Sequence, residues 1–374
     1  MYIRKSIIKA NIAILLISGI NSTALPQTNT PINFAAKISG EFRSNISRQP
    51  GLEREEDFRI NLVFNANKEW RFISHRKITL SYDLQHHRYD EFRNFTRYDQ
   101  TIGGQFVQNL AQNYKFTLSN DFRFRHHPST TQFNYTKNIL DLNIKRNPGG
   151  RTSWTLGYKN WLKSYVNNSS LSKYVSHRGY IKFNRVFNSA TNFGAKFEYQ
   201  NHKGNLYAGS TAPEQPLNII GNRYVLRLNL DKVFSSKFVT SASYKFEWDL
   251  ADDFDIPNPD GVFGDEESDE FIADDSDFGY KKHLGSFSMH WRANRKISFL
   301  FFYLYYTKGF EHWRISPDGP KRHDKVLFFS HQIRFKLSKK FGVGIRHNFE
   351  TNRTNLNPYR YEIHSLSAGL NFTP

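Results

Sequence analysis

The stretch "HSLSAGLNFTP" (His364–Pro374) closes the chain and decides the fold. Leu366, Ala368, Leu370 and Phe372 are apolar, whereas the residues between them are small or polar. This alternation has a period of two residues, which predicts a β-strand with one apolar face and one polar face. A basic chain with a formal net charge of +18 therefore ends on a half-apolar strand. The fold depends on whether that apolar face meets a protein core or a lipid bilayer.

The same alternation recurs along the whole chain, for example in "FRINLVFNA" from Phe58, "NYKFTLSNDFRFR" from Asn113 and "RYVLRLNL" from Arg223. Outside the N-terminal segment we find no stretch with the period of a helix. About sixteen strands are predicted, with starts near residues 32, 56, 76, 95, 114, 132, 152, 174, 192, 222, 237, 282, 297, 325, 340 and 360. Fourteen strands remain an alternative, because segment 132–146 changes parity near Lys137 and segment 297–306 is apolar on both faces. A bulge or a turn would explain the change of parity.

Long and short connections alternate between these segments, from the long run 252–277 to short ones such as "RNPGG" and "SKK". This pattern is typical of outer-membrane barrels, which have long outer loops and tight periplasmic turns. A β-sandwich or a propeller would bury aliphatic faces in a core, but here the apolar faces are rich in aromatics and the polar faces carry charge. We therefore expect an all-β fold, a transmembrane antiparallel β-barrel whose apolar face meets lipid.

The N-terminal segment 1–24 has the pattern of a secretory signal peptide. Three basic residues precede a short apolar run from Ile12 to Ile20, and Ser22-Thr23-Ala24 has the small-x-small form of a cleavage site. The barrel is expected over residues 25–374. Few residues separate the cleavage site from the first strand, so we expect no N-terminal plug domain. A wide barrel without a plug leaves an aqueous channel.

The parity of each strand predicts which charged side chains point inward. The basic residues expected to line the pore are Arg59, Lys77, Arg97, Lys115, Arg123, Arg125, Lys159, Arg178, Lys182, Lys196, Arg227, Lys245, Arg292, Arg334, Lys336 and Arg346. The inward acids are Asp57, Asp83, Asp99, Asp121, Asp141, Glu198, Glu247, Asp249 and Glu350. The basic excess predicts a preference for anions. The alternative is that acids and bases on neighbouring strands pair and cancel.

Tyr180, Phe328 and Trp161 also point inward by parity. Aromatic faces in a wet lumen can stack on sugar rings, although packing against loops would place them in the same way. Both interpretations stay open at this point.

An acidic run lies between two predicted strands and contains no Lys or Arg. A solvated loop that repels itself is one interpretation, and a lid that folds into the basic mouth and gates it is another. Calcium binding is disfavoured because "DIPNPDG" lacks the spacing of an EF-hand loop. The candidate gating residues are Asp252, Asp253, Asp255, Asp265, Glu266, Glu267, Asp269, Glu270, Asp274, Asp275 and Asp277.

Enzymatic functions find little support in the sequence. There is no G-x-S-x-G motif, and the absence of cysteine excludes thiolate nucleophiles and zinc–thiolate sites. The paired histidines at 86–87 and 126–127 have no carboxylate at a repeated ligand spacing, so we expect no metal site. We name no catalytic residue and expect no cofactor. Nucleic-acid binding is disfavoured by the predicted export and by the dispersal of the basic residues.

Two stretches carry a family resemblance: "YYTKGFEHW" (Tyr305–Trp313) and the final "SLSAGLNF" (Ser365–Phe372). They resemble the monomeric outer-membrane porin G family, and the density of inward Arg and Lys is similar to that of the oligogalacturonate-specific porins. The resemblance implies a passive channel in the Gram-negative outer membrane. The short third outer connection, "HHPSTTQ" (His126–Gln132), lacks the folded loop of trimeric porins and favours a monomer.

The function expected from the sequence is passive diffusion of small anionic or saccharide solutes, acidic oligosaccharides among them. Its partners would be those solutes, outer-membrane lipid and lipopolysaccharide. The alternative is a surface barrel without transport, an adhesin or an outer-membrane hydrolase, whose lumen is closed by its loops. Conductance would separate the two.

Overall fold

The computed structural model describes residues 28–29, 31–44, 56–72, 75–91, 93, 96–111, 113–129, 134–147, 150–165, 171–188, 190–206, 217–251, 279–314, 319–355 and 360–372. These ranges form strands and short turns. The strands are β1 (Thr28–Asn29), β2 (Asn33–Arg43), β3 (Asp57–Phe72), β4 (Arg76–Tyr89), β5 (Arg97–Ala111), β6 (Tyr114–His126), β7 (Tyr135–Arg146), β8 (Thr152–Tyr165), β9 (Leu171–Asn188), β10 (Thr191–Leu206), β11 (Leu217–Ser235), β12 (Phe238–Ala251), β13 (Tyr280–Arg292), β14 (Ile297–Arg314), β15 (Lys321–Lys336), β16 (Phe341–Thr354) and β17 (Tyr361–Phe372). No helix in this part of the chain is long and apolar enough to cross a membrane.

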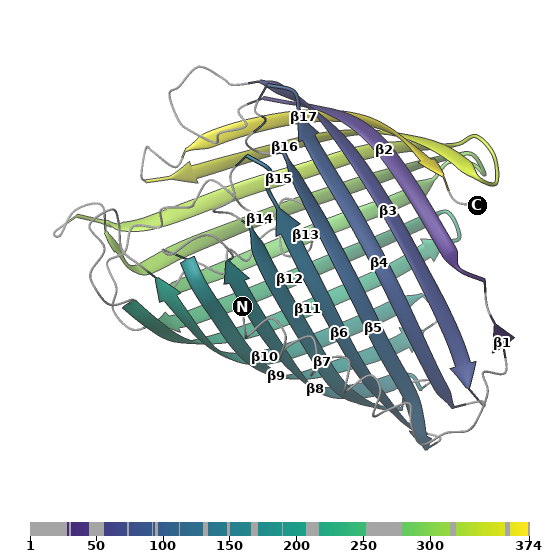
Figure 1. Ribbon diagram of the computed structural model, residues 1–374, viewed down its shortest axis with the longest axis horizontal. Coiled ribbons are helices and arrows are strands. Elements are labelled where there is room, and N and C mark those ends of the chain that lie inside the picture. The colour runs from purple at the N-terminus through teal and green to yellow at the C-terminus, as the bar shows by residue number, and fades with distance from the viewer. Residues whose placement is uncertain are drawn as a thin grey trace.

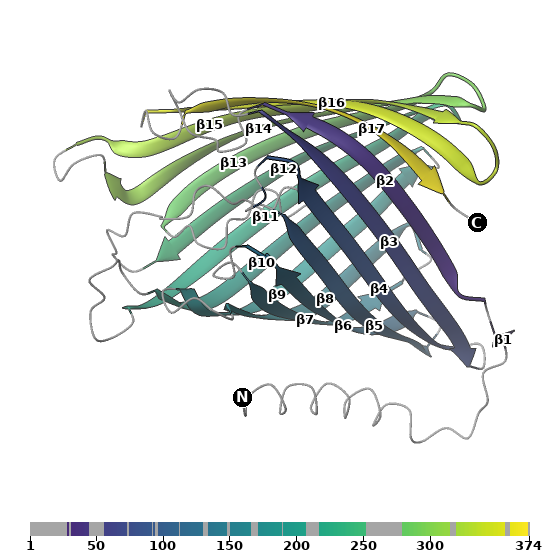
Figure 2. The same cartoon turned by 45° about the horizontal axis from the view of Figure 1, so that its top comes forward.

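Sixteen strands, β2 to β17, form a closed antiparallel barrel in which each strand pairs with its neighbours in sequence. The ring closes where β17 pairs with β2, with Leu370 opposite Ile38 and Leu366 opposite Phe42. Figures 1 and 2 show these first and last strands side by side, purple against yellow. The short β1 pairs with the end of β3, beyond β2. Closure satisfies the backbone hydrogen bonds along every edge, which a strand in lipid requires.

The sixteen strands agree with the sequence prediction, and the alternative of fourteen is wrong. The change of parity near Lys137 is also wrong: β7 pairs with β6 and β8 along its whole length without a register shift. Thr136 and Asn138 are polar residues at outward positions near the start of β7, and they made the alternation look as if it changed parity. The apolar inner side of β14 is real, and its neighbours β13 and β15 pair with it continuously from Tyr280 to Arg292 and from Lys325 to Phe335.

Short and long connections alternate around the barrel. Ranges 73–75, 112–113 and 236–237 join strands at one end, whereas ranges 44–56, 207–216 and 252–279 join strands at the other. Long loops face the outside in barrels of this type, so we call the second end the outer end. The acidic run 252–277, the predicted signal peptide 1–24 and the last two residues lie outside the described residues.

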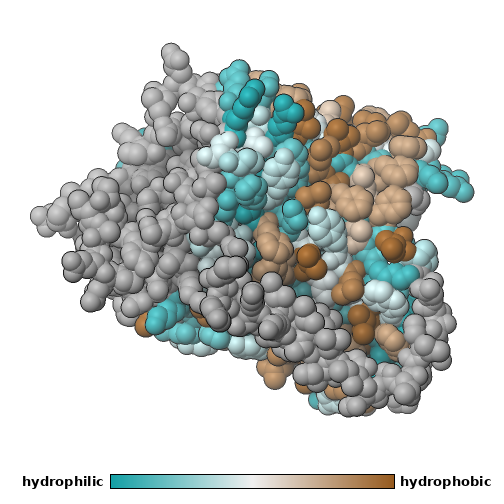
Figure 3. Space-filling model, in the orientation of Figure 1, coloured by the Kyte–Doolittle hydropathy of each residue, from teal (hydrophilic) through white to brown (hydrophobic). Residues whose placement is uncertain are grey.

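The outward face of the barrel is apolar. Leu366 is 55% exposed and Leu370 is 41% exposed, whereas Ser365, the residue before Leu366, is buried. Each strand from β2 to β17 carries at least one exposed large apolar side chain, and Figure 3 shows apolar side chains gathered over the right-hand part of the visible face. Apolar residues that are exposed in such number need lipid around them. The apolar face of the final strand is therefore its lipid face, and this is the architecture of a Gram-negative outer-membrane protein.

Candidate functional site in the barrel interior

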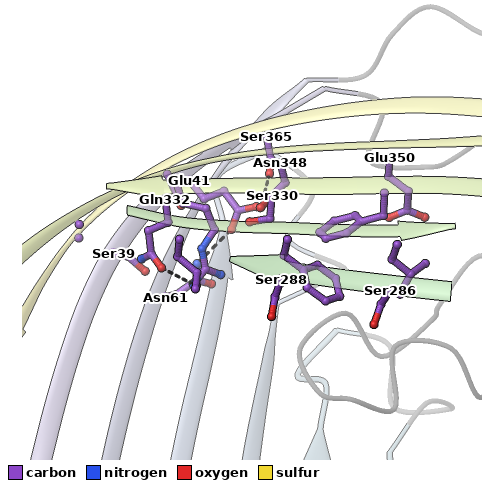
Figure 4. Close-up of a pocket in the computed structure, with 18 of the residues that line it drawn as sticks. Ser39, Glu41, Asn61, Ser286, Ser288, Ser330, Gln332, Asn348, Glu350 and Ser365 are labelled. Atoms are coloured by element: carbon purple, nitrogen blue, oxygen red, sulfur yellow. Dashed lines mark hydrogen bonds between the residues drawn. The ribbon is translucent and has the colours of Figure 1, made fainter. Parts of the chain in front are cut away.

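The inward face of the ring encloses a cavity of about 900 Å³. Its lining comes from β2, β3 and β4 on one side and from β11 to β17 on the other. Figure 4 shows Ser39, Glu41 and Asn61 from the first strands in one space with Ser288 and Gln332 from late strands. Segments far apart in sequence therefore build one polar chamber. Its lining includes six basic residues and two acids: Lys37, Arg43, Arg59, Arg227, Lys245, Arg346, Glu41 and Glu350.

The strand register places all sixteen predicted basic residues on the inward face, because their parity matches that of the cavity lining. They are not gathered in one place. Arg59, Arg227, Lys245 and Arg346 line the large cavity. Lys182 lines a neighbouring cavity of about 270 Å³, and Arg292, Arg334 and Lys336 line one of about 590 Å³ beside the short turns. The other eight share the inward face of β4 to β10: Lys77, Arg97, Lys115, Arg123, Arg125, Lys159, Arg178 and Lys196.

Four of the predicted residues form a row across four strands. Lys182 on β9 lies directly opposite Lys196 on β10, which lies opposite Arg227 on β11, which in turn lies opposite Lys245 on β12. We call these four residues the basic row. Like charges directly opposite one another in a sheet are unfavourable, so the row needs either neighbouring carboxylates or a mobile anion.

Carboxylates compensate part of the row. Lys196 pairs with Glu198 and Lys245 pairs with Glu247, one register position closer to the outer end. Among the residues that the structure describes, no carboxylate lies within ion-pair distance of Arg227 or Lys182. The expected cancellation is thus incomplete, and the uncompensated charge lies beside the large cavity.

The inward acids Asp99 on β5 and Asp141 on β7 pair in the same way. The Asp99 carboxylate forms ion pairs with Arg97 and Arg125, with N···O distances of 3.1 and 2.6 Å. The Asp141 carboxylate forms one with Lys159 at 3.0 Å. These pairs are partly exposed to the interior, so each is weak by itself. They hold the paired side chains in place along this wall.

Toward the outer end lies a buried charged layer, of which sequence reasoning predicted Asp249 but missed the bases. Arg223 donates to Asp249 over 2.7 Å, and Arg322 binds Asp324 through two hydrogen bonds of 3.0 and 2.7 Å. The Lys282 ammonium lies 4.2 Å from the centre of the Tyr306 ring, and the Lys308 ammonium lies 4.1 Å from the centre of the Tyr280 ring. These bases are at most 8% exposed. Extending the alternation to the ends of β11 and β13 to β15 would have found them, because they keep the inward parity.

Aromatic side chains organise the bases on the wall from β7 to β10. Trp161 is buried, with the Lys137 ammonium 4.0 Å and the Arg178 guanidinium 3.3 Å from its ring centre. Tyr180 donates a hydrogen bond of 3.0 Å to Asp141. Its ring lies across Gly157, where a Cβ would approach it to 2.1 Å. The inward placement predicted for these aromatics is seen, and they pack against protein groups.

The paired histidines separate onto the two faces. His86 stacks on Tyr98 outside, with ring centres 4.2 Å apart, whereas His87 is buried inside and bonded to Asn61 over 2.6 Å. His127 follows β6 in an outer connection, and burial, aided by Arg125 nearby, lowers the pKa of its imidazole to about 4. In the described ranges no group of histidines and carboxylates could hold a metal ion.

Comparison with known proteins gives a likeness of fold without a likeness of sequence. No family model matches the chain, and no curated protein matches it in sequence. The solved structure of OccK2 (OpdF) from Pseudomonas aeruginosa in complex with glucuronate is 8% identical, with a TM-score of 0.50 over 94% of this chain and 99% of that chain. A second structure of OccK2 has the same identity and TM-score over 91% and 98% of the two chains.

The outer-membrane protein OprD from Pseudomonas aeruginosa is 7% identical, with a TM-score of 0.48 over 94% of this chain and 95% of that chain. At these identities the likeness to OccK2 shows the fold alone: a closed antiparallel barrel of the outer-membrane porin type. The resemblance to the porin G and oligogalacturonate-specific families stays an expectation from the sequence.

Proposed function

We propose that this barrel is an outer-membrane diffusion channel whose basic interior favours small anionic solutes. The observation that carries the proposal is the basic row, in which Arg227 and Lys182 lack carboxylate partners among the described residues and line open cavities. A narrow space with a positive lining and low-dielectric walls concentrates anions. Because the site is built from separate single charges, an anion can enter and still leave.

Acidic oligosaccharides are one class of solute that this interior could take. The cavity around Lys182 supports this idea. Besides Lys182 and the carboxylate of Asp231, its polar lining is hydroxyl and amide: Asn184, Asn192, Asn229, Ser241, Ser243, Ser286 and Ser288. Such groups can replace the water that hydrates sugar hydroxyls. We propose a monomer in contact with outer-membrane lipid and lipopolysaccharide, in which no residue has a catalytic role.

The test is the reversal potential of the refolded protein in a planar bilayer with a gradient of KCl. We expect single-channel conductance with a preference for chloride over potassium. A preference for potassium would contradict the basic-row argument. Folding is checked beforehand by the β-sheet circular dichroism spectrum and by the mobility of the unheated protein on a gel.

One observation favours a second candidate, the barrel without transport. Toward the outer end the inward side chains are almost completely buried, with Tyr280 at 1%, His87 at 0% and Gln200 at 1% exposure. Little open space therefore surrounds these side chains, in contrast to the cavities beside the basic row. A barrel that is correctly folded but never conducts would favour an adhesin or another surface function.

A further inference from the structure

One side of the large cavity is apolar, which is unusual inside a water-filled barrel. We define the apolar wall as six inward residues of β13, β14, β15 and β17: Leu284, Leu300, Phe302, Leu304, Phe328 and Ile363. Its centre is β14, where three inward positions in succession carry large apolar side chains. The Phe302 and Phe328 rings lie side by side, with centres 6.0 Å apart.

The apolar wall is only partly covered by the protein. Leu304 and Ile363 are buried, at 6% and 4% exposure, whereas Phe302 and Phe328 are only half-buried and line the cavity. Apolar surface left facing water is unfavourable in proportion to its area. A solute that covers the two phenylalanine rings would remove that cost.

The apolar wall adjoins the basic row. Leu284 lies directly opposite Lys245 across the β12–β13 pair, and Lys245 lies directly opposite Arg227. Arg227 keeps an uncompensated charge among the described residues and lines the same cavity as Phe302. A cationic group is thus placed at the edge of an apolar surface. Ser286 and Ser288, next along the inward face of β13, add hydroxyl groups at that edge.

We propose that this cavity is a binding site for an amphipathic monoanion, a carboxylate joined to an aromatic ring or a short alkyl chain. The carboxylate pairs with Arg227, and the apolar body lies against Phe302 and Phe328. The inference rests on the proposed anion channel and deepens it by naming the class of solute. A cavity of about 900 Å³ that combines an apolar wall with polar and charged side chains suits a small ligand.

The same geometry disfavours a sugar acid at this site. The hydroxyls of a uronate that lie over the Phe302 and Phe328 rings would lose hydrogen bonds to water, and Ser288 and Ser330, directly opposite Phe302, would replace only part of them. The apolar wall therefore selects within the anions that the basic row attracts.

The probes are phenylacetate, acetate and glucuronate, each added to the full folded chain. Binding is measured by saturation-transfer NMR on the protein in lipid nanodiscs, and by block of the ion current in a planar bilayer. We expect phenylacetate to bind about tenfold more tightly than acetate or glucuronate, since covering the rings supplies the difference. Equal affinity for the three probes would overturn the proposal.

Four variants separate the two parts of the site. Arg227→Gln is expected to weaken phenylacetate binding about tenfold through the lost charge-assisted hydrogen bond. Phe302→Ser is expected to reduce the preference for phenylacetate over acetate, and Phe302→Leu is expected to retain it. Lys232→Gln, on the outward face of the same strand as Arg227, is the matched control and is expected to bind as the parent does.

The outcomes distinguish this inference from the proposed function. A chloride-selective channel without a preference for phenylacetate would leave the channel and remove the amphipathic site. Binding in nanodiscs that depends on Arg227 and Phe302, without any conductance, would keep the site and remove the channel. A preference that survives Phe302→Ser would show that the apolar wall does not hold the ligand.

Discussion

Strands β11 and β14 have similar outward faces and opposite inward faces. Outward, β11 carries Leu226, Leu228 and Leu230, and β14 carries aromatic residues such as Tyr303 and Tyr305. Inward, β11 presents the bases Arg223 and Arg227, whereas β14 presents the leucines and the phenylalanine of the apolar wall. Lipid requires apolar side chains on the outer face of every strand, whereas the side chains of the inner face differ from one part of the ring to another. Any chemistry that distinguishes this barrel from others therefore lies inside it.

The largest expected effect is a loss of stability when a charge is placed on the lipid-facing side of β11. Leu228→Arg places a charge in lipid, halfway between Tyr224 and Lys232, and should lower the free energy of unfolding by about 2–4 kcal/mol. Asn229→Arg is the matched control, because it adds the same charge one residue away on the side that lines the cavities. Urea unfolding of the protein refolded into vesicles, followed by tryptophan fluorescence, measures the two changes. Equal destabilisation by both would contradict the assignment of faces.

A medium effect is expected from removing the charge that distinguishes the inner side of β11. The double change Arg227→Gln and Lys182→Gln removes two bases that have no carboxylate partners among the described residues. The permeability of chloride relative to potassium should fall by roughly two- to fivefold, because the field inside the cavity weakens. Reversal potentials at low and high salt check this, since screening should reduce the difference in concentrated KCl. Lys232→Gln, on the outward face of β11, should leave selectivity unchanged.

The smallest expected effect is a dependence of stability on pH, which should arise from His127 and not from its neighbour His126. Burial holds the pKa of His127 at about 4, below the ordinary value of 6.5, so its neutral form is preferred in the folded protein. Between these two pH values the unfolded chain binds more protons than the folded one, and stability falls as the pH is lowered. We expect the melting temperature to decrease by a few degrees from pH 7 to pH 4.5.

The variant His127→Gln should reduce this dependence on pH. His126→Gln changes the neighbouring histidine, which lies at the end of β6 and contacts the Tyr98 ring on the outer side, and should retain the dependence. Melting curves of the three proteins at matched pH values separate the two histidines. A reduction by His126→Gln and none by His127→Gln would show that the buried imidazole is not the group responsible.

The strand plan of the barrel could be predicted from the sequence because it is encoded locally. The alternation of apolar and polar residues within segments such as "FRINLVFNA" predicted the strand starts to within a few residues. The inward parity of all sixteen predicted bases agrees with the strand register. The errors arose where local composition imitates another signal. Polar residues at outward positions of β7 imitated a change of parity, and an apolar inner side of β14 weakened the alternation there.

The sequence by itself determined which side of each strand meets lipid, because the two-residue period of a strand is a property of consecutive residues. It also determined the excess of basic side chains on the other side. Only the tertiary structure decided which of those bases meet acids. Glu198 compensates Lys196, whereas Arg227 directly opposite that lysine has no such partner among the described residues. The reason is physical: the register between strands sets which side chains face each other, and closure of the ring sets what lies across the cavity.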